Sequence, residues 1–159
     1  MFEHIPYSGT KEEQYNQVIH QLGALIQDEP NRIANLANAS ALLRQFLDDI
    51  NWVGFYLTDT ERGELVLGPF QGLVACVRIP FGKGVCGTAA RDRKTLRVAD
   101  VHAFPGHIGC DAASRSEIVV PMIEDGNVIG VLDIDSPLQD RFDETDEQML
   151  QEFVRVLLS

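Results

Sequence analysis

The chain has 159 residues, of which 45% are hydrophobic and 23% charged. These proportions are typical of a globular domain and exclude disordered, collagen-type and coiled-coil sequences. The formal net charge of -11 repels phosphate backbones and anionic lipid surfaces, which argues against nucleic acid or a membrane as a partner.

Two amphipathic helices are predicted at the start of the chain. Within residues 11–27, apolar side chains recur with the spacing of one helical face, at Tyr15, Val18, Ile19, Leu22, Leu25 and Ile26. A second helix is expected to begin at Pro30, a residue suited to the first helical position, and to end at Asp48. Both helices should cover one side of the core.

The apolar pattern then changes to a period of two. From Asn51, one set of side chains (Val53, Phe55, Leu57) alternates with another (Trp52, Gly54, Tyr56), which predicts a strand that ends at the polar turn 58–64. Residues 65–69 and 73–79 are predicted to be the next two strands, closing on Pro80, which cannot donate to a sheet. Cys76 is therefore expected within a strand.

The second half of the chain continues with shorter elements. A glycine loop leads into a short helix within 82–90, and 95–99 is a short strand. Residues 100–114 have no periodicity, and so long a connection in a compact domain is more often functional. Residues 116–124 and 127–135 are two strands around Asp125-Gly126, a strong hairpin signal, and a final helix begins near Asp143. Because the strands cluster and the helices lie at the ends, we expect one α+β domain over residues 1–159.

The three cysteines are Cys76, Cys86 and Cys110. The chain has no run of about 18 apolar residues, and residues 1–10 lack the features of a signal peptide, so we expect a cytoplasmic location. An odd number of widely spaced cysteines in such a protein argues against a disulfide framework. No Cys-x2-Cys or His-x3-His pair is present, so no metal is expected.

Two of the cysteines have surroundings that favour reactivity. Cys110 lies in the long loop, where a ligand could reach it, and His102 and His107 are candidates to help form its thiolate. Cys86 lies near the start of the short helix, where backbone N–H groups and the helix dipole would favour a thiolate. The alternative for each is a cysteine packed as a small apolar residue.

Three acidic residues lie on the two hairpin strands. Asp133 and Asp135 share one face of an otherwise apolar strand, and Glu117 opens the strand before it. A regular two-residue turn would pair Glu117 with Ile134 and point it away from the two aspartates. A three-residue loop or a single bulge would bring all three acids together, and the residues alone leave both arrangements open.

Four segments together resemble the free methionine-(R)-sulfoxide reductases, which are single GAF domains. They are Asn51-Trp52-Val53-Gly54-Phe55-Tyr56, Gly84-Val85-Cys86-Gly87, the block from Asp100 to Asp111, and Ser116-Glu117-Ile118-Val119-Val120-Pro121. The resemblance covers nearly the whole chain, and 100–121 is its specific part. Residues 126–135 alone would indicate only a GAF domain.

The resemblance implies both a fold and a set of residue roles. The fold is a six-stranded antiparallel sheet with the N- and C-terminal helices on one face and a loop-covered pocket on the other. Cys110 matches the catalytic cysteine, Cys76 the usual resolving cysteine, and Cys86 a third cysteine able to exchange disulfides. The acids that bind substrate and handle the sulfoxide oxygen correspond to Glu117, Asp133 and Asp135, with Trp52 as a pocket wall. We therefore predict a bulge or a three-residue closure in the hairpin.

The implied activity is reduction of free methionine-(R)-sulfoxide through a cysteine sulfenic acid and an intramolecular disulfide. Thioredoxin, with NADPH and thioredoxin reductase, is the implied electron donor, no cofactor is bound, and the likeness suggests a homodimer. The alternative is a GAF module that senses a cyclic nucleotide or a tetrapyrrole without turnover. Against a tetrapyrrole, the Cys-His pair of its attachment site is missing, because Asp111 follows Cys110.

Overall fold

The computed structural model describes residue 3 and residues 6–159. Residues 1–2 and 4–5, part of the segment considered above for a signal peptide, lie outside the described residues. The helices are α1 (Lys11–Ile26), α2 (Arg32–Phe46), α3 (Gly84–Asp92), the 3-10 helix η1 (Val101–Ala103) and α4 (Glu144–Leu157). The strands are β1 (Trp52–Asp59), β2 (Glu64–Gly72), β3 (Arg78–Pro80), β4 (Leu96–Val98), β5 (Ser116–Glu124) and β6 (Asn127–Ser136). Within this described part, no helix is both long and apolar enough to cross a membrane.

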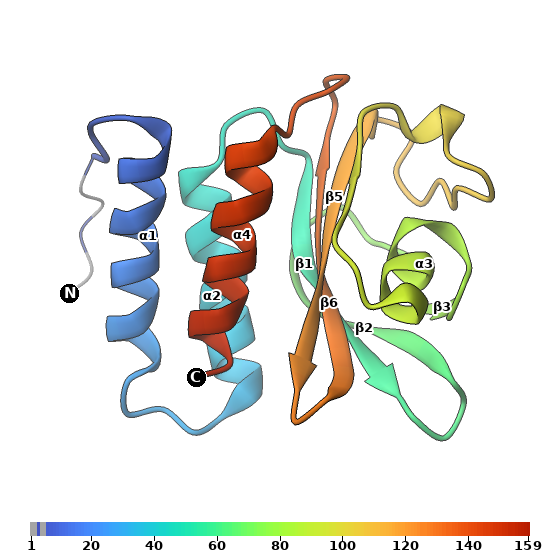
Figure 1. Ribbon diagram of the computed structural model, residues 1–159, viewed down its shortest axis with the longest axis horizontal. Coiled ribbons are helices and arrows are strands. Elements are labelled where there is room, and N and C mark those ends of the chain that lie inside the picture. Colours follow the sequence, from blue (N-terminus) through green and yellow to red (C-terminus); the bar gives the residue numbers. More distant parts are fainter. Residues whose placement is uncertain (1–2, 4–5) are drawn as a thin grey trace.

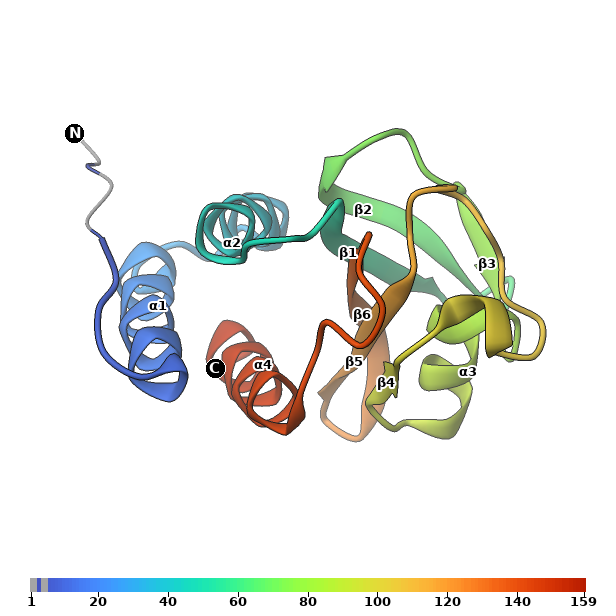
Figure 2. The ribbon, with the colours of Figure 1, turned by 90° about the horizontal axis from the view of Figure 1, so that it is seen from above.

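The strands form one antiparallel sheet in the order β3-β2-β1-β6-β5-β4. Helices α2 and α4 cover one face of this sheet, and α1 packs outside them as a further layer (Figure 1). Seen from above, α3 and the long loop after β4 lie against the opposite face (Figure 2). This arrangement confirms the predicted α+β fold, with helices on one face and loops over the other.

The two faces of β1 divide the buried side chains into two cores. Val53 and Phe55 point into the core beneath α2 and α4, whereas Trp52 and Tyr56 point toward α3. Burying each large apolar side chain contributes about 1.5–3 kcal/mol, so both cores hold the sheet in place. The predicted alternation in β1 is therefore confirmed.

Helix α2 begins later than the sequence suggested. The side chain of Asn31 accepts the backbone N–H of Ala34 at 3.0 Å, which makes Asn31 the N-cap and Arg32 the first helical residue. Pro30 therefore precedes the cap, and the expectation that it opens the helix is wrong. The helix also ends earlier than predicted, at Phe46 instead of Asp48.

The predicted strand 73–79 is wrong over most of its length. The chain leaves the sheet after Gly72, whose φ of 146° suits glycine, and only Arg78–Pro80 pairs with β2. Between Gly72 and Arg78, a side chain of β1 binds the backbone in place of a neighbouring strand. The indole N–H of Trp52 donates to the carbonyl of Leu73 at 3.1 Å. Cys76 thus lies in a connecting segment.

The β5–β6 hairpin keeps its two-residue turn and also contains a bulge. Glu124 pairs with Asn127 across Asp125-Gly126, whose φ values of 51° and 79° suit a tight hairpin turn. Farther along, Ile123 pairs with Val128 but Met122 pairs with Gly130, so one residue of β6 is left over. That shift pairs Glu117 with Asp135, which confirms the predicted bulge.

The glycine beside the bulge should be essential for stability. A Cβ at Gly130 would lie 2.3 Å from the carbonyl oxygen of Tyr56 and 2.9 Å from Cε of Met122. We expect Gly130→Ala to lower the free energy of unfolding by about 1–3 kcal/mol, measured by urea denaturation. As a control, Gly23→Ala in α1, where a Cβ would have no neighbour within 4 Å, should stabilise by about 0.5–1 kcal/mol. A Gly130→Ala protein as stable as the parent would contradict this account.

Candidate active site

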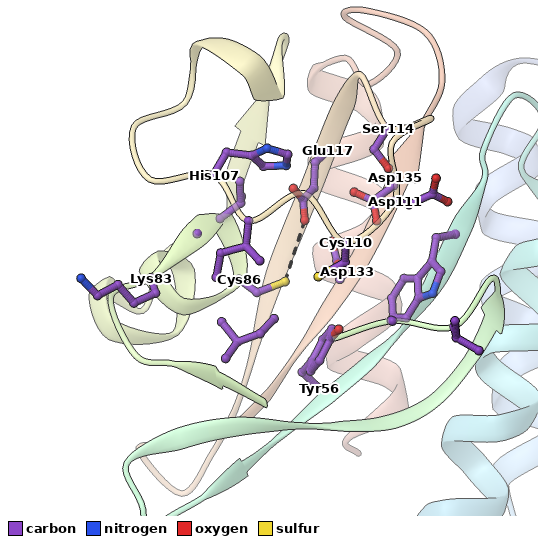
Figure 3. Close-up of a pocket in the computed structure, with 17 residues that line it drawn as sticks. Tyr56, Lys83, Cys86, His107, Cys110, Asp111, Ser114, Glu117, Asp133 and Asp135 are labelled. Carbon is purple, nitrogen blue, oxygen red and sulfur yellow. Dashed lines mark hydrogen bonds between the residues drawn. The ribbon is translucent and has the colours of Figure 1, made fainter. Parts of the chain in front are cut away.

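A cavity of about 50 Å³ lies on the sheet face opposite α2 and α4, under α3 and the long loop. Figure 3 shows its polar residues converging from β1, α3, β5, β6 and the loop. The residues with reactive or hydrogen-bonding side chains are Trp52, Tyr56, Lys83, Cys86, His107, Cys110, Asp111, Ser114, Glu117, Asp133 and Asp135. This set includes each site residue expected from the sequence except Cys76, which is bonded to Cys110.

The sheet register sets the acidic floor of the cavity. Asp135 pairs with Trp52 on one side and with Glu117 on the other, so these three side chains form a row across β1, β6 and β5. Asp133 lies two residues back on the same face of β6. All three acids therefore meet in one cavity because of the bulge in β6.

Burial raises the pKa values of these acids. Glu117 and Asp133 are each only 6% exposed, and within the described residues none of the three carboxyls is in an ion pair. Burial, with the charges of Asp133 and Asp135, raises the pKa of Glu117 well above its usual range. Burial, with the charges of Asp133 and Asp111, does the same to the pKa of Asp135, and burial alone raises the pKa of Asp133. The cavity thus favours the protonated, proton-donating form of its carboxyl groups.

Asp133 has a hydrogen-bonding atom with no partner. Its Oδ1 is buried and forms no hydrogen bond to the described protein atoms. An unpaired buried carboxyl oxygen costs about 1–3 kcal/mol, so such a group in a cavity is suited to a polar ligand.

Cys86 is buried and uncharged. Its Sγ lies 3.8 Å from Oε2 of Glu117, and the residue is 4% exposed. Burial, followed by the charges of Asp133 and Glu117, raises the pKa of the Cys86 thiol well above its usual value. The expectation that the start of α3 would favour a thiolate is therefore wrong, because burial and the acids outweigh the helix dipole.

The structure joins Cys76 and Cys110 in a disulfide, with their Cα atoms 5.8 Å apart, and leaves Cys86 free. These are the two cysteines that the resemblance assigns to resolution and catalysis. Cys110 is exposed in the long loop and Cys76 is half-buried between β2 and β3. The bond therefore connects two segments outside the sheet at the edge of the acidic cavity.

Side chains near the start of β1 hold both segments. The hydroxyl of Tyr56 donates to the carbonyl of Cys76 at 2.9 Å. Just before β1, Nδ2 of Asn51 donates to Oδ2 of Asp111 at 2.9 Å and to Oγ of Ser114 at 3.1 Å. No role was predicted for Tyr56 or Asn51, although both belong to the segment 51–56 that carries part of the family resemblance and Tyr56 shares the strand face of Trp52.

The two histidines near Cys110 differ in position. Only His107 lines the cavity, and its pKa is lowered by partial burial and then by the nearby His102. The two rings lie 6.2 Å apart, with His102 exposed. His107 is thus the candidate proton acceptor for the thiol of Cys110 once the disulfide is reduced.

One group of side chains could hold a metal ion. Donor atoms of Cys86, Glu117 and Asp133 lie within 4.8 Å of one another. Sequence spacing gave no sign of this group, because the three residues come from α3, β5 and β6. A metal there would have to displace the protons that burial favours.

Comparisons with known proteins assign the chain to a family. The model of the GAF domain matches residues 36–157. The free methionine-R-sulfoxide reductase of Escherichia coli is 53% identical, over 92% of this chain and 88% of that protein. The enzyme of the same name from Saccharomyces cerevisiae is 45% identical, over 98% and 91%.

A solved structure agrees with these relatives. The free methionine-R-sulfoxide reductase of Neisseria meningitidis in complex with its substrate superposes with a TM-score of 0.93 and 48% identity, covering 98% of this chain and 93% of that one. The fold is thus that of a GAF domain. Within that class, the chain belongs to the free methionine-R-sulfoxide reductase family.

The buried acids should make stability fall as pH rises. A carboxyl whose pKa is raised by folding binds its proton more tightly in the folded state, so stability is lost as pH rises above the usual glutamate value of 4.5. This loss is about 1.4 kcal/mol per pH unit for one group until its folded-state pKa is reached. We expect Glu117→Gln to lose less stability than the parent between pH 5 and pH 8, measured by urea unfolding.

The matched control for this pH dependence is Glu61→Gln, which removes the same charge from the exposed turn between β1 and β2. Its stability should follow the parent at each pH. Parallel curves for the parent and Glu117→Gln would show that Glu117 does not hold a proton in the folded protein.

Proposed function

We propose that this chain, acting as a single GAF domain over residues 1–159, reduces free methionine-(R)-sulfoxide to methionine. The observation that carries this proposal is the set of three acids with raised pKa values in the cavity that Cys110 also lines. A sulfoxide is electrophilic at sulfur only when its oxygen is protonated or strongly hydrogen-bonded, and a thiolate then attacks that sulfur. The cavity contains acids that can protonate the oxygen and a cysteine, Cys110, that can supply the thiolate.

The first step consumes the sulfoxide. Glu117, Asp133 and Asp135 bind the substrate and supply the proton to its oxygen, while Trp52 forms the wall beside them. The thiolate of Cys110, with its proton accepted by His107, attacks the substrate sulfur. The oxygen passes to the sulfur of Cys110, which becomes a sulfenic acid as methionine leaves.

The second step forms the disulfide. The thiol of Cys76 attacks the sulfenic sulfur of Cys110, and the hydroxyl leaves as water. The Cα separation of 5.8 Å in the bonded pair lies within the usual disulfide range. Cys86 is the slower substitute, because burial and the neighbouring acids keep its thiol protonated.

The third step restores the thiols. An external protein dithiol, for which we propose thioredoxin supplied by NADPH and thioredoxin reductase, takes over the disulfide and leaves Cys76 and Cys110 reduced. No bound cofactor is needed for these steps. In the disulfide form, the cavity of about 50 Å³ holds only a few water molecules, so reduction must free the long loop before a substrate enters.

The test of the proposed function is NADPH oxidation in the presence of thioredoxin, its reductase and one sulfoxide. We expect turnover with the R epimer of free methionine sulfoxide, little with the S epimer, and little with methionine sulfoxide inside a peptide, because a pocket that closes around a free amino acid excludes the backbone on both sides of a peptide residue. Equal rates on the free and peptide-bound forms would contradict the proposal. Saturable binding of a cyclic nucleotide without turnover would favour a sensing module.

Substitution of each cysteine should separate the steps. Cys110→Ser should abolish methionine formation and leave the unfolding transition of the reduced protein unchanged, since Cys110 is exposed. Cys76→Ser should still form one methionine per chain in a single turnover, while its thioredoxin-driven turnover falls by at least about tenfold. Methionine release is measured by chromatography. Turnover by Cys110→Ser would remove this residue as the nucleophile.

A further inference from the structure

Several exposed apolar side chains lie in the two segments that the disulfide joins. Leu73, Val74 and Val77 are 67%, 89% and 61% exposed, and Ile108 is 38% exposed. The first three lie in the segment that contains Cys76, and Ile108 precedes Cys110 by two residues. We call these four residues the apolar rim.

Other exposed large apolar residues within the described part of the chain are scattered. Ile33 lies on α2, Ile123 at the bulge of the hairpin, and Leu138 in the connection before α4. Single exposed apolar residues need no explanation, but a contiguous group is characteristic of an interaction surface. Val74 and Ile108 both line the mouth of the cavity, so the segments of the rim meet there.

The rim also differs in charge from the rest of the molecule. Residues 65–91 and 101–110 contain no aspartate or glutamate, although the chain has 24 acidic residues and a net charge of -11. Lys83 is exposed at the mouth of the cavity and has no ion pair within the described residues. The surface around the disulfide is therefore apolar and poorer in acidic residues than the rest of the protein.

We infer that the apolar rim is the docking surface for the protein dithiol that reduces the Cys76–Cys110 disulfide, and that this partner presents an apolar face around its reactive cysteine. The inference rests on the proposed function for the origin of the disulfide. A thiolate must reach a disulfide sulfur directly, and Cys110 lies exposed beside the rim. Transient complexes between redox proteins have small interfaces. Four exposed aliphatic side chains could form the apolar centre of such an interface.

Reduction of the disulfide needs no reactant other than the two thiols of the partner. A thiolate of the partner attacks one sulfur of the Cys76–Cys110 bond, forms a mixed disulfide, and releases the other sulfur as a thiolate that takes up a proton. The partner's second thiol then attacks the mixed disulfide. The partner ends as a disulfide, and both cysteines of this chain end as thiols.

The test measures reduction of the disulfide in oxidised protein with no sulfoxide present. Thioredoxin with its reductase is one reductant, followed by NADPH consumption, and dithiothreitol is the other, followed by thiol titration. The variants are Leu73→Glu, Val77→Glu and their combination, since neither side chain lines the cavity. Ile33→Glu is the matched control, because Ile33 is similarly exposed at 57% and lies on the far side of the sheet.

We expect the double variant to lower the second-order rate constant with thioredoxin by at least about tenfold. Reduction by dithiothreitol should change less than about twofold, and Ile33→Glu should behave as the parent with both reductants.

Three results would overturn the inference. In the first, thioredoxin reduces the double variant as fast as it reduces Ile33→Glu. In the second, the rate of reduction by dithiothreitol falls as much as the rate with thioredoxin, which would indicate altered access to the disulfide. A loss accompanied by a change in oligomeric mass would assign the rim to contact between copies of this chain. Because the test uses no sulfoxide, it separates the inference from the proposed function. If the protein reduced no sulfoxide but its reduction by thioredoxin still depended on the rim, the proposed function would be refuted and the docking surface would remain supported.

Discussion

Three carboxyl groups on one face of a sheet, two of them buried and one half-buried, with no ion pair among the described residues, are the constraint on which the site depends. Burial makes the charged forms unfavourable and raises the pKa values of Glu117, Asp133 and Asp135. Burial and the charges of these acids also raise the pKa of the Cys86 thiol. The cavity therefore favours protonated carboxyl groups next to an exposed cysteine, Cys110.

Strand β1 and the region around it assemble this site from separate parts of the chain. Trp52 and Tyr56 bind the backbone of the segment that contains Cys76, and Asn51 binds the loop that follows Cys110. The bulge in β6 then aligns the acids beside Trp52. Each contact ties a non-sheet segment to a strand or its start, and this holds two cysteines outside the sheet at bonding distance.

The elements that could be predicted from sequence are those with local causes. The two faces of β1, the hairpin turn and the long loop all follow from patterns within a few residues. The segment around Cys76 was assigned wrongly because its apolar, β-branched residues resemble a strand, whereas contacts from distant Trp52 and Tyr56 decide its path. The face of Glu117 depended on one unpaired residue in β6, and the state of Cys86 on acids that only the fold brings near.

The most direct test of the account is a single turnover of fully reduced protein with free methionine-(R)-sulfoxide and no reductant. Methionine is quantified, the remaining thiols are alkylated, and the peptides are mapped by mass spectrometry. The account predicts one methionine per chain, a disulfide between Cys76 and Cys110, and Cys86 alkylated. Methionine formation without loss of thiols, or a dominant Cys86–Cys110 disulfide with Cys76 still alkylated, would contradict it.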